Sequence, residues 1–184
     1  MKLANAADEI QTAGAEVVVL NVDSPPRNAA LAARWYLPFP IVSDPGGEDW
    51  LKPLGLFNPD ERDGIALPAL YLLGPDGSEI YGRCSRDFAD RQYDEAALTA
   101  LTAAGLAPLD PGLDPWDPEV EPDADADGVF TPELYGPYFR GAGSSAIAIS
   151  MRLDGPASDE ANAQYEMCVS MGKAWSRRRK QFSG

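Results

Sequence analysis

A β-hairpin between residues 65 and 84 is the feature that most constrains how this chain can fold. An apolar run over 65–73 enters a Gly-Pro-Asp-Gly turn at 74–77, and a second run over 78–84 leaves it. Asp-Gly between two such runs favours a tight turn, because glycine adopts positive φ without steric cost. Pro68 stands near the start of the first run, where its missing N–H removes no ladder hydrogen bond. The sequence therefore predicts two antiparallel strands.

The segments around this hairpin predict an alternation of helices and strands. The run Glu16–Val22 is almost unbroken in β-branched residues, which is typical of a parallel strand buried on both faces. Helices that end near glycines or prolines precede and follow it. The predicted elements are a helix over 2–12 ended by Gly14, a helix from Pro25 capped by Ser24 and stopped at Leu37-Pro38, a short strand over 39–44, a brief helix over 50–56, a polar loop over 58–64, and a helix from Asp94 ended by Gly105. This order predicts an α/β fold.

Four linked segments, 17–25, 37–45, 66–77 and 87–91, resemble the thioredoxin-like redoxins and peroxiredoxin-like proteins of the AhpC/TSA group. The resemblance covers about residues 1–106 and implies a thioredoxin-like mixed sheet. It also implies an antioxidant oxidoreductase that reduces peroxides or disulfides through a thiol, without a cofactor, and that takes electrons from a thiol reductant such as a thioredoxin. Pro68 would then be the cis-proline that faces the redox cysteine, close to the helix that contains Leu3.

The same resemblance places the reactive cysteine at the start of the helix before the 17–22 strand. A thiol there has a lowered pKa, because the helix dipole and free N–H groups stabilise the thiolate. In this sequence that helix begins at or before Met1, so we expect a sheet that is incomplete at its N-terminal side. Three explanations are open: the start is misplaced, a second polypeptide supplies the segment, or the redoxin has lost its thiol. The chain as given is expected to be inactive, and the alternative is a non-catalytic redoxin-derived scaffold that binds a protein partner.

Two cysteines remain as candidates. Cys84 ends the hairpin beside Arg83 and Arg86, whose charges could lower the pKa of its thiol and make it reactive. The alternative is a half-buried cysteine without a chemical role. Cys168 falls on the apolar face of a predicted helix and is expected to be a core residue.

Beyond the redoxin-like part, residues 107–128 are rich in Pro, Asp and Glu, which predicts a linker. Asp123, Asp125 and Asp127 imitate the start of a calcium loop, but Leu134 stands where the twelfth-position glutamate belongs. An acidic, solvated linker is the favoured interpretation, with weak calcium binding as the alternative. Residues 129–184 predict a helical extension, with a helix start at 131–133, a helix or strand over 145–153, and a helix over 159–179.

The composition narrows the classes of function. The net charge of −14 argues against nucleic acid and anionic membranes as partners. The absence of histidine excludes triads and general bases that depend on that residue. No apolar stretch approaches the roughly 18 residues of a membrane span, and no secretory signal opens the sequence, so we expect a cytoplasmic protein.

Overall fold

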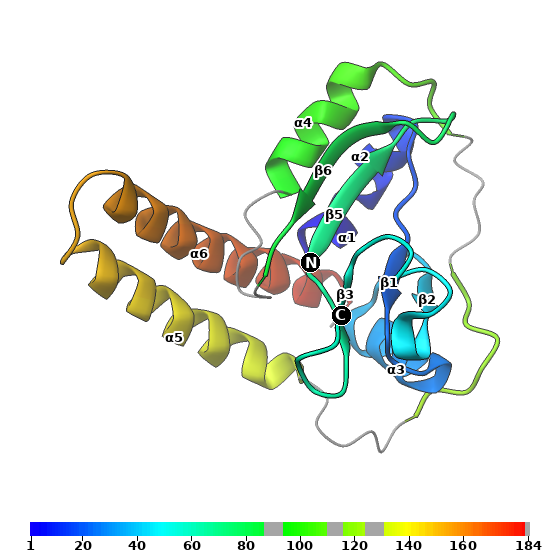
Figure 1. Cartoon of the computed structure of the whole chain (residues 1–184), viewed down its shortest axis with the longest axis horizontal. Coiled ribbons are helices and arrows are strands. Elements are labelled where there is room, and N and C mark those ends of the chain that lie inside the picture. The colour runs from blue at the N-terminus through cyan, green and yellow to red at the C-terminus, as the bar shows by residue number, and fades with distance from the viewer. Residues whose placement is uncertain (87–93, 110–115, 124–130, 183–184) are drawn as a thin grey trace. The chain divides into compact units, whose positions relative to one another are not determined.

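The computed structural model describes residues 1–86, 94–109, 116–123 and 131–182. The chain forms two compact units, of which one is Ala6–Ala126 and the other combines Met1–Asn5 with Asp127–Gly184. Figure 1 labels the helices and strands of both. The division differs from the predicted one at the N-terminus, because the first five residues pack with the C-terminal helices. The predicted helix over 2–12 is accordingly two helices, α1 (Lys2–Asn5) and α2 (Ala7–Thr12), which separate at Ala6.

A parallel β-α-β unit opens the larger unit. Strand β1 (Val19–Asn21) pairs with β2 (Ile41–Ser43), and α3 (Pro25–Trp35) connects them. Pro25 occupies the first helical position, as predicted, where its missing N–H has no intrahelical partner to lose. The apolar face of α3 is largely alanine and ends in Trp35, which is 4% exposed.

The prediction of a strand buried on both faces is wrong for 16–22. Only 19–21 form β1, none of them is fully buried, and Val18 is 58% exposed. Among the described residues β1 pairs with β2 alone.

Two antiparallel hairpins follow. The first joins β3 (Phe57–Asn58) to β4 (Ile65–Ala66), after a 3-10 turn, η1 (Pro45–Gly47). Residues 50–56 form turns where a brief helix was predicted, and the predicted polar loop contributes Asn58 to β3. Phe57 explains this arrangement, because its ring fills the space beside Gly47 and Gly64.

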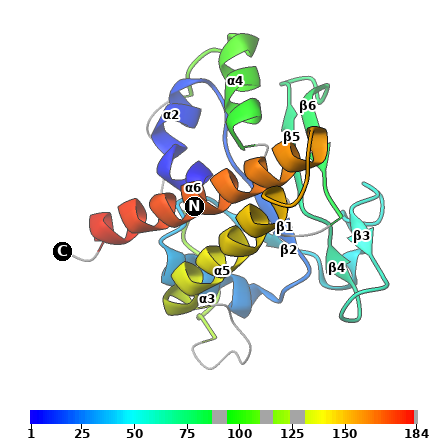
Figure 2. The same cartoon turned by 90° about the vertical axis from the view of Figure 1, so that its left-hand side faces the viewer.

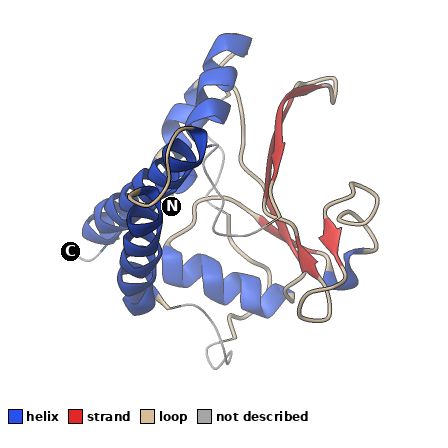
Figure 3. Ribbon diagram, turned by 60° about the vertical axis from the view of Figure 1, so that its left-hand side comes forward, coloured by secondary structure: helices blue, strands red, loops and turns tan. Residues whose placement is uncertain are grey.

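The second hairpin confirms the antiparallel pair predicted around the turn at 74–77, but residues 65–66 of the first predicted run belong to β4 and pair with β3 instead. Strand β5 (Ala69–Leu73) pairs with β6 (Glu79–Cys84), and Gly77 adopts a φ of 79° in the turn between them. Helix α4 (Asp94–Ala104) packs on this hairpin. Figure 3 shows the strands in red as separate ladders. In the described part of the chain these are three two-stranded ladders, where a single mixed sheet was predicted; the coarser α/β character holds.

The described part of the predicted linker belongs to the larger unit. The Leu109 amide donates to the Gln11 carbonyl oxygen at 3.0 Å, and the Asp123 amide donates to that of Pro26 at 3.0 Å. Trp116 lines a cavity of about 180 Å³ together with Ile10 and Phe39. The composition predicted a linker, but backbone hydrogen bonds and the side chain of Trp116 join these residues to the rest of the unit.

The other unit is a helical hairpin of α5 (Pro132–Ser150) and α6 (Pro156–Phe182), which lie side by side in Figures 1 and 2. The helix start predicted at 131–133 is confirmed, and 145–150 belong to α5, so the strand alternative is wrong. Helix α1 packs on α6: the Asn5 side chain donates to the Ala174 carbonyl oxygen, and Arg178 donates to that of Ala4, both at 2.9 Å. None of the helices in the described residues has the length and apolar character that a membrane span requires.

Candidate functional site

The structure brings together the two residues that the sequence singled out for redox chemistry. Cys84 is the last residue of β6, and its partner across the ladder is Ala69, which directly follows Pro68. The next residue, Ser85, donates its amide to the Pro68 carbonyl oxygen at 2.8 Å. Pro68 and Cys84 therefore lie at the same end of the β5–β6 ladder, opposite the turn.

The expectation of a cis-proline is wrong: the Leu67–Pro68 peptide bond is trans. Pro68 lies in extended backbone between β4 and β5. The Leu67 amide donates to the Leu56 carbonyl oxygen on one side, and the Pro68 carbonyl accepts from Ser85 on the other. A trans bond keeps the chain extended, so that it passes from one ladder into the next with both of these hydrogen bonds intact. The expected closeness of Pro68 to Leu3 stays a prediction.

Cys84 has an exposed thiol. Its hydrogen-bond partner among the described residues is the Ser85 carbonyl oxygen, 3.8 Å from the sulfur. Arg83 precedes it on the same strand, and successive side chains of a strand point to opposite faces. The guanidinium of Arg83 therefore lies on the other face of the hairpin from the Cys84 thiol, although the two residues are adjacent in the sequence. Exposure, rather than a cationic neighbour on the strand, is what makes this thiol available.

Cys168 has the opposite environment. It lies in the middle of α6 and is 2% exposed, as expected for a core residue. Burial raises the pKa of the Cys168 thiol, because the thiolate would lose its hydration. The nucleophilic form is disfavoured there, so Cys168 is a poor candidate for chemistry.

The acidic motif can be followed only in part. The backbone amide of Asp123 donates a hydrogen bond to the Pro26 carbonyl oxygen, and Asp125 and Asp127 lie outside the described residues. In the part of the chain that the structure describes, no group of three acidic or cysteine side chains is arranged to hold a metal ion.

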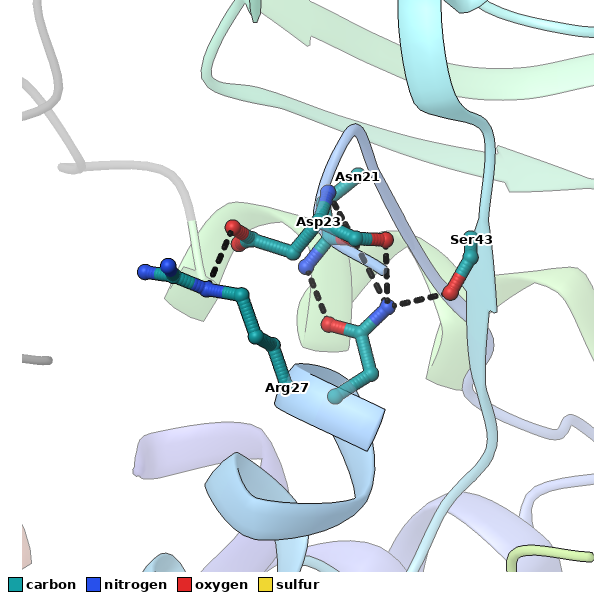
Figure 4. Close-up of polar contacts among 5 residues, drawn as sticks. Asn21, Asp23, Arg27 and Ser43 are labelled. Atoms are coloured by element: carbon teal, nitrogen blue, oxygen red, sulfur yellow. Dashed lines mark hydrogen bonds and ion pairs between the residues drawn. The ribbon is translucent and has the colours of Figure 1, made fainter. Parts of the chain in front are cut away.

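A polar cluster around the buried side chain of Asn28 lies at the carboxyl ends of β1 and β2, and the sequence motifs did not predict it (Figure 4). Asn28 of α3 is 1% exposed, and its side-chain amide donates to Asn21 at 2.9 Å and to the Ser43 hydroxyl at 2.7 Å. Asn21 returns a hydrogen bond to the Asn28 oxygen at 2.8 Å. Nearby, Arg27 and Asp23 form an ion pair at the surface, 3.4 Å apart.

Ligands often bind α/β proteins at such strand ends. Here, however, the amide and hydroxyl groups satisfy one another, and none of Asn21, Asn28 and Ser43 titrates near neutral pH. The cluster fastens α3 to both strands. Its one signal in the sequence was a pair of asparagines, one ending an apolar strand and the other inside an alanine-rich helix.

Comparison with known proteins adds one finding. The family model of the AhpC/TSA family matches residues 1–79, from α1 through β5 to the start of β6. This is shorter than the 1–106 over which motifs were recognised, and it includes Pro68 but not Cys84. The comparisons found no similar curated protein and no similar solved structure. Residues 1–79 are therefore similar to the AhpC/TSA family, the redoxin and peroxiredoxin-like group that the sequence motifs indicate.

Proposed function

We propose that the Ala6–Ala126 unit is a thioredoxin-like redoxin unit and that the protein carries out thiol–disulfide exchange through Cys84. The AhpC/TSA match supports the redoxin character. The observation that carries the assignment to Cys84 is its exposed position beside Pro68 at the end of the β5–β6 ladder.

The reaction follows general thiol chemistry. The Cys84 thiolate attacks one sulfur of a disulfide R–S–S–R′, forms the mixed disulfide Cys84–S–S–R and releases R′–S⁻. A second thiolate, R″–S⁻, then attacks the R sulfur of the mixed disulfide, forms the disulfide R–S–S–R″ and releases Cys84 as a thiolate. Because Cys168 is buried, this second thiol comes from a separate reductant such as a thioredoxin.

Peroxide reduction by these 184 residues is expected to be slow. A peroxidatic thiol gains from a helix N-terminus, where the dipole and free N–H groups stabilise the thiolate. Cys84 ends a strand, and Cys168 lies in the middle of a helix. The proposal is therefore disulfide exchange with little hydroperoxide activity.

The test compares disulfide and peroxide substrates. Reduction of hydroxyethyl disulfide should be retained in Cys168→Ser and lost in Cys84→Ser, while peroxide consumption with dithiothreitol as donor stays at the rate of dithiothreitol alone. Exchange that survives in Cys84→Ser would refute the assignment of the thiol. Peroxide consumption that depends on Cys84 would instead show a peroxidatic role for that residue.

The second candidate function is a redoxin-derived scaffold without catalysis that binds a protein partner. It is favoured by the exposed apolar side chains at the α5–α6 connection, where Met151 is 82% and Ile149 50% exposed. Equal exchange rates for the wild-type protein and free cysteine would support this candidate over the enzyme.

A further inference from the structure

A groove of about 740 Å³ runs along one side of the α5–α6 hairpin. We propose that this groove binds a small amphipathic carboxylate, with an alkyl chain on the apolar part of the groove and the carboxylate at its cationic end. The proposal concerns the helical unit alone and does not depend on the redox role of Cys84.

The order of the lining residues follows from the antiparallel packing of the helices. The rings of Tyr135 and Trp175 are 6.1 Å apart, Gly143 packs against Cys168, and the Ser158 hydroxyl donates to the Ser150 carbonyl oxygen at 3.0 Å. The start of α5 therefore lies beside the end of α6. Lining residues from those two segments share one end of the groove, and those nearer the connection share the other.

The cations that line the groove gather at one end. Arg140 comes from the first half of α5, and Lys173 and Arg177 come from the last turns of α6. The two α6 residues are four apart and share a helix face. None of the three forms an ion pair with a residue that the structure describes. On a chain of net charge −14, a cationic cluster of this kind favours an anion as its partner.

The other end carries no charged lining residue. Tyr165 and Val169 line it, and its floor includes Cys168, which is 2% exposed. At Gly172, between the two ends, an added Cβ would meet no atom within 4 Å, so the missing side chain leaves the groove open. An alkyl chain placed there would gain roughly 0.8 kcal/mol for each buried methylene group.

The distribution of charge selects the occupant. An acidic amphipathic helix from another protein carries its charges along its length, whereas this groove has its cations at one end only. A ligand with a single anionic head matches that pattern. The volume also lies within the range of about 300–1,000 Å³ that small-molecule sites occupy.

Titration calorimetry of the full chain with sodium dodecanoate, below its micelle concentration, tests the proposal. One dodecanoate should bind per chain, and dodecyltrimethylammonium, with the same alkyl chain and the opposite charge, should bind about tenfold more weakly or worse. Gly172→Leu fills the groove and should abolish binding. Gly141→Leu is the matched control, because Gly141 also has no atom near its Cβ position but does not line the groove.

A second pair of variants tests the cationic end. The double variant Lys173→Gln, Arg177→Gln should weaken dodecanoate binding about tenfold, whereas Arg179→Gln, Lys180→Gln removes the same charge outside the groove and should leave it unchanged. Circular dichroism checks that the helices persist, and if Gly172→Leu does not fold, the charge variants decide.

Three results would overturn the proposal: no saturable binding of dodecanoate, equal affinity for both surfactants, or binding that Gly172→Leu retains. Binding of an acidic Leu/Glu model helix in the absence of dodecanoate binding would also overturn it and assign the groove to a protein partner.

Discussion

The two cysteines have the same chemistry and opposite surroundings. Cys84 is exposed, whereas Cys168 is 2% exposed and burial raises the pKa of its thiol. We therefore expect 5,5′-dithiobis(2-nitrobenzoate) to modify Cys84 at least about tenfold faster than Cys168 at pH 8. The single variants Cys84→Ser and Cys168→Ser assign the two phases, and both thiols should react alike in 6 M guanidinium. Fast modification of Cys168 in the folded protein would contradict this environment.

Asp44 is the buried carboxylate whose protonation bears on stability. Burial would raise the pKa of Asp44, but hydrogen bonds from the backbone N–H groups of Leu51, Asp49 and Trp50, together with the charge of Lys52, outweigh it and hold the pKa below its usual value. A carboxylate whose pKa is lower in the folded state than in the unfolded state stabilises the fold at every pH above its unfolded-state pKa. This contribution disappears as the pH falls through the folded-state pKa.

We expect Asp44→Asn to lower the melting temperature at pH 7, and the difference from wild type to shrink as the pH falls below about 4. Thermal unfolding followed by circular dichroism across this range measures both effects. Asp49→Asn is the control, because the Asp49 side chain is exposed. A constant difference at every pH would mean that the carboxylate charge of Asp44 is not what stabilises the turn.

At the scale of elements, the Asn28 side chain joins α3 to both strands of the parallel pair. Asn28→Ala would leave the half-buried Asn21 and Ser43 side chains without their shared partner and should cost about 1–3 kcal/mol of unfolding free energy. Ser24→Ala should change little, because Ser24 occupies the N-cap position of α3 but makes no side-chain hydrogen bond there. Urea denaturation measures both, and a larger loss for Ser24→Ala would contradict the structure.

The β5–β6 turn depends on a left-handed residue. Gly77 has a φ of 79°, and Gly77→Ala should cost about 1 kcal/mol. Gly77→Asn should cost less, because asparagine tolerates this conformation. Urea denaturation measures the loss of unfolding free energy in each variant. A smaller loss for Gly77→Asn than for Gly77→Ala would show that strain at positive φ causes the loss. Equal losses would indicate that the turn relaxes to another conformation.

At the scale of the whole molecule, the first five residues belong to the helical unit formed mainly by the C-terminal part of the chain. Deleting 1–5 removes the Asn5–Ala174 and Arg178–Ala4 hydrogen bonds. Hydrogen exchange should then accelerate in α6 around residues 174–178, while β5 and β6 keep their protection. Exchange that rises equally in the hairpin would contradict the assignment of 1–5 to the helical unit.

Local patterns determined the elements of this protein that local forces stabilise. The turn at 74–77, the start of α3 at Pro25 and the end of α4 at Gly105 follow from which residues tolerate positive φ or lack an N–H, and all could be predicted. The redoxin motifs likewise predicted the family of the first part of the chain. These properties need no knowledge of distant partners.

Only the tertiary structure decided which distant residues meet. It placed Cys84 beside Pro68, closed the Asn21–Asn28–Ser43 cluster, and split the N-terminal helix between two units. It also left Val18 exposed, because burial depends on the elements packed over a segment and not on its own β-branched residues. Charge at one end of the α5–α6 groove also depends on packing, since the two helices had to align antiparallel before their cations could share a site.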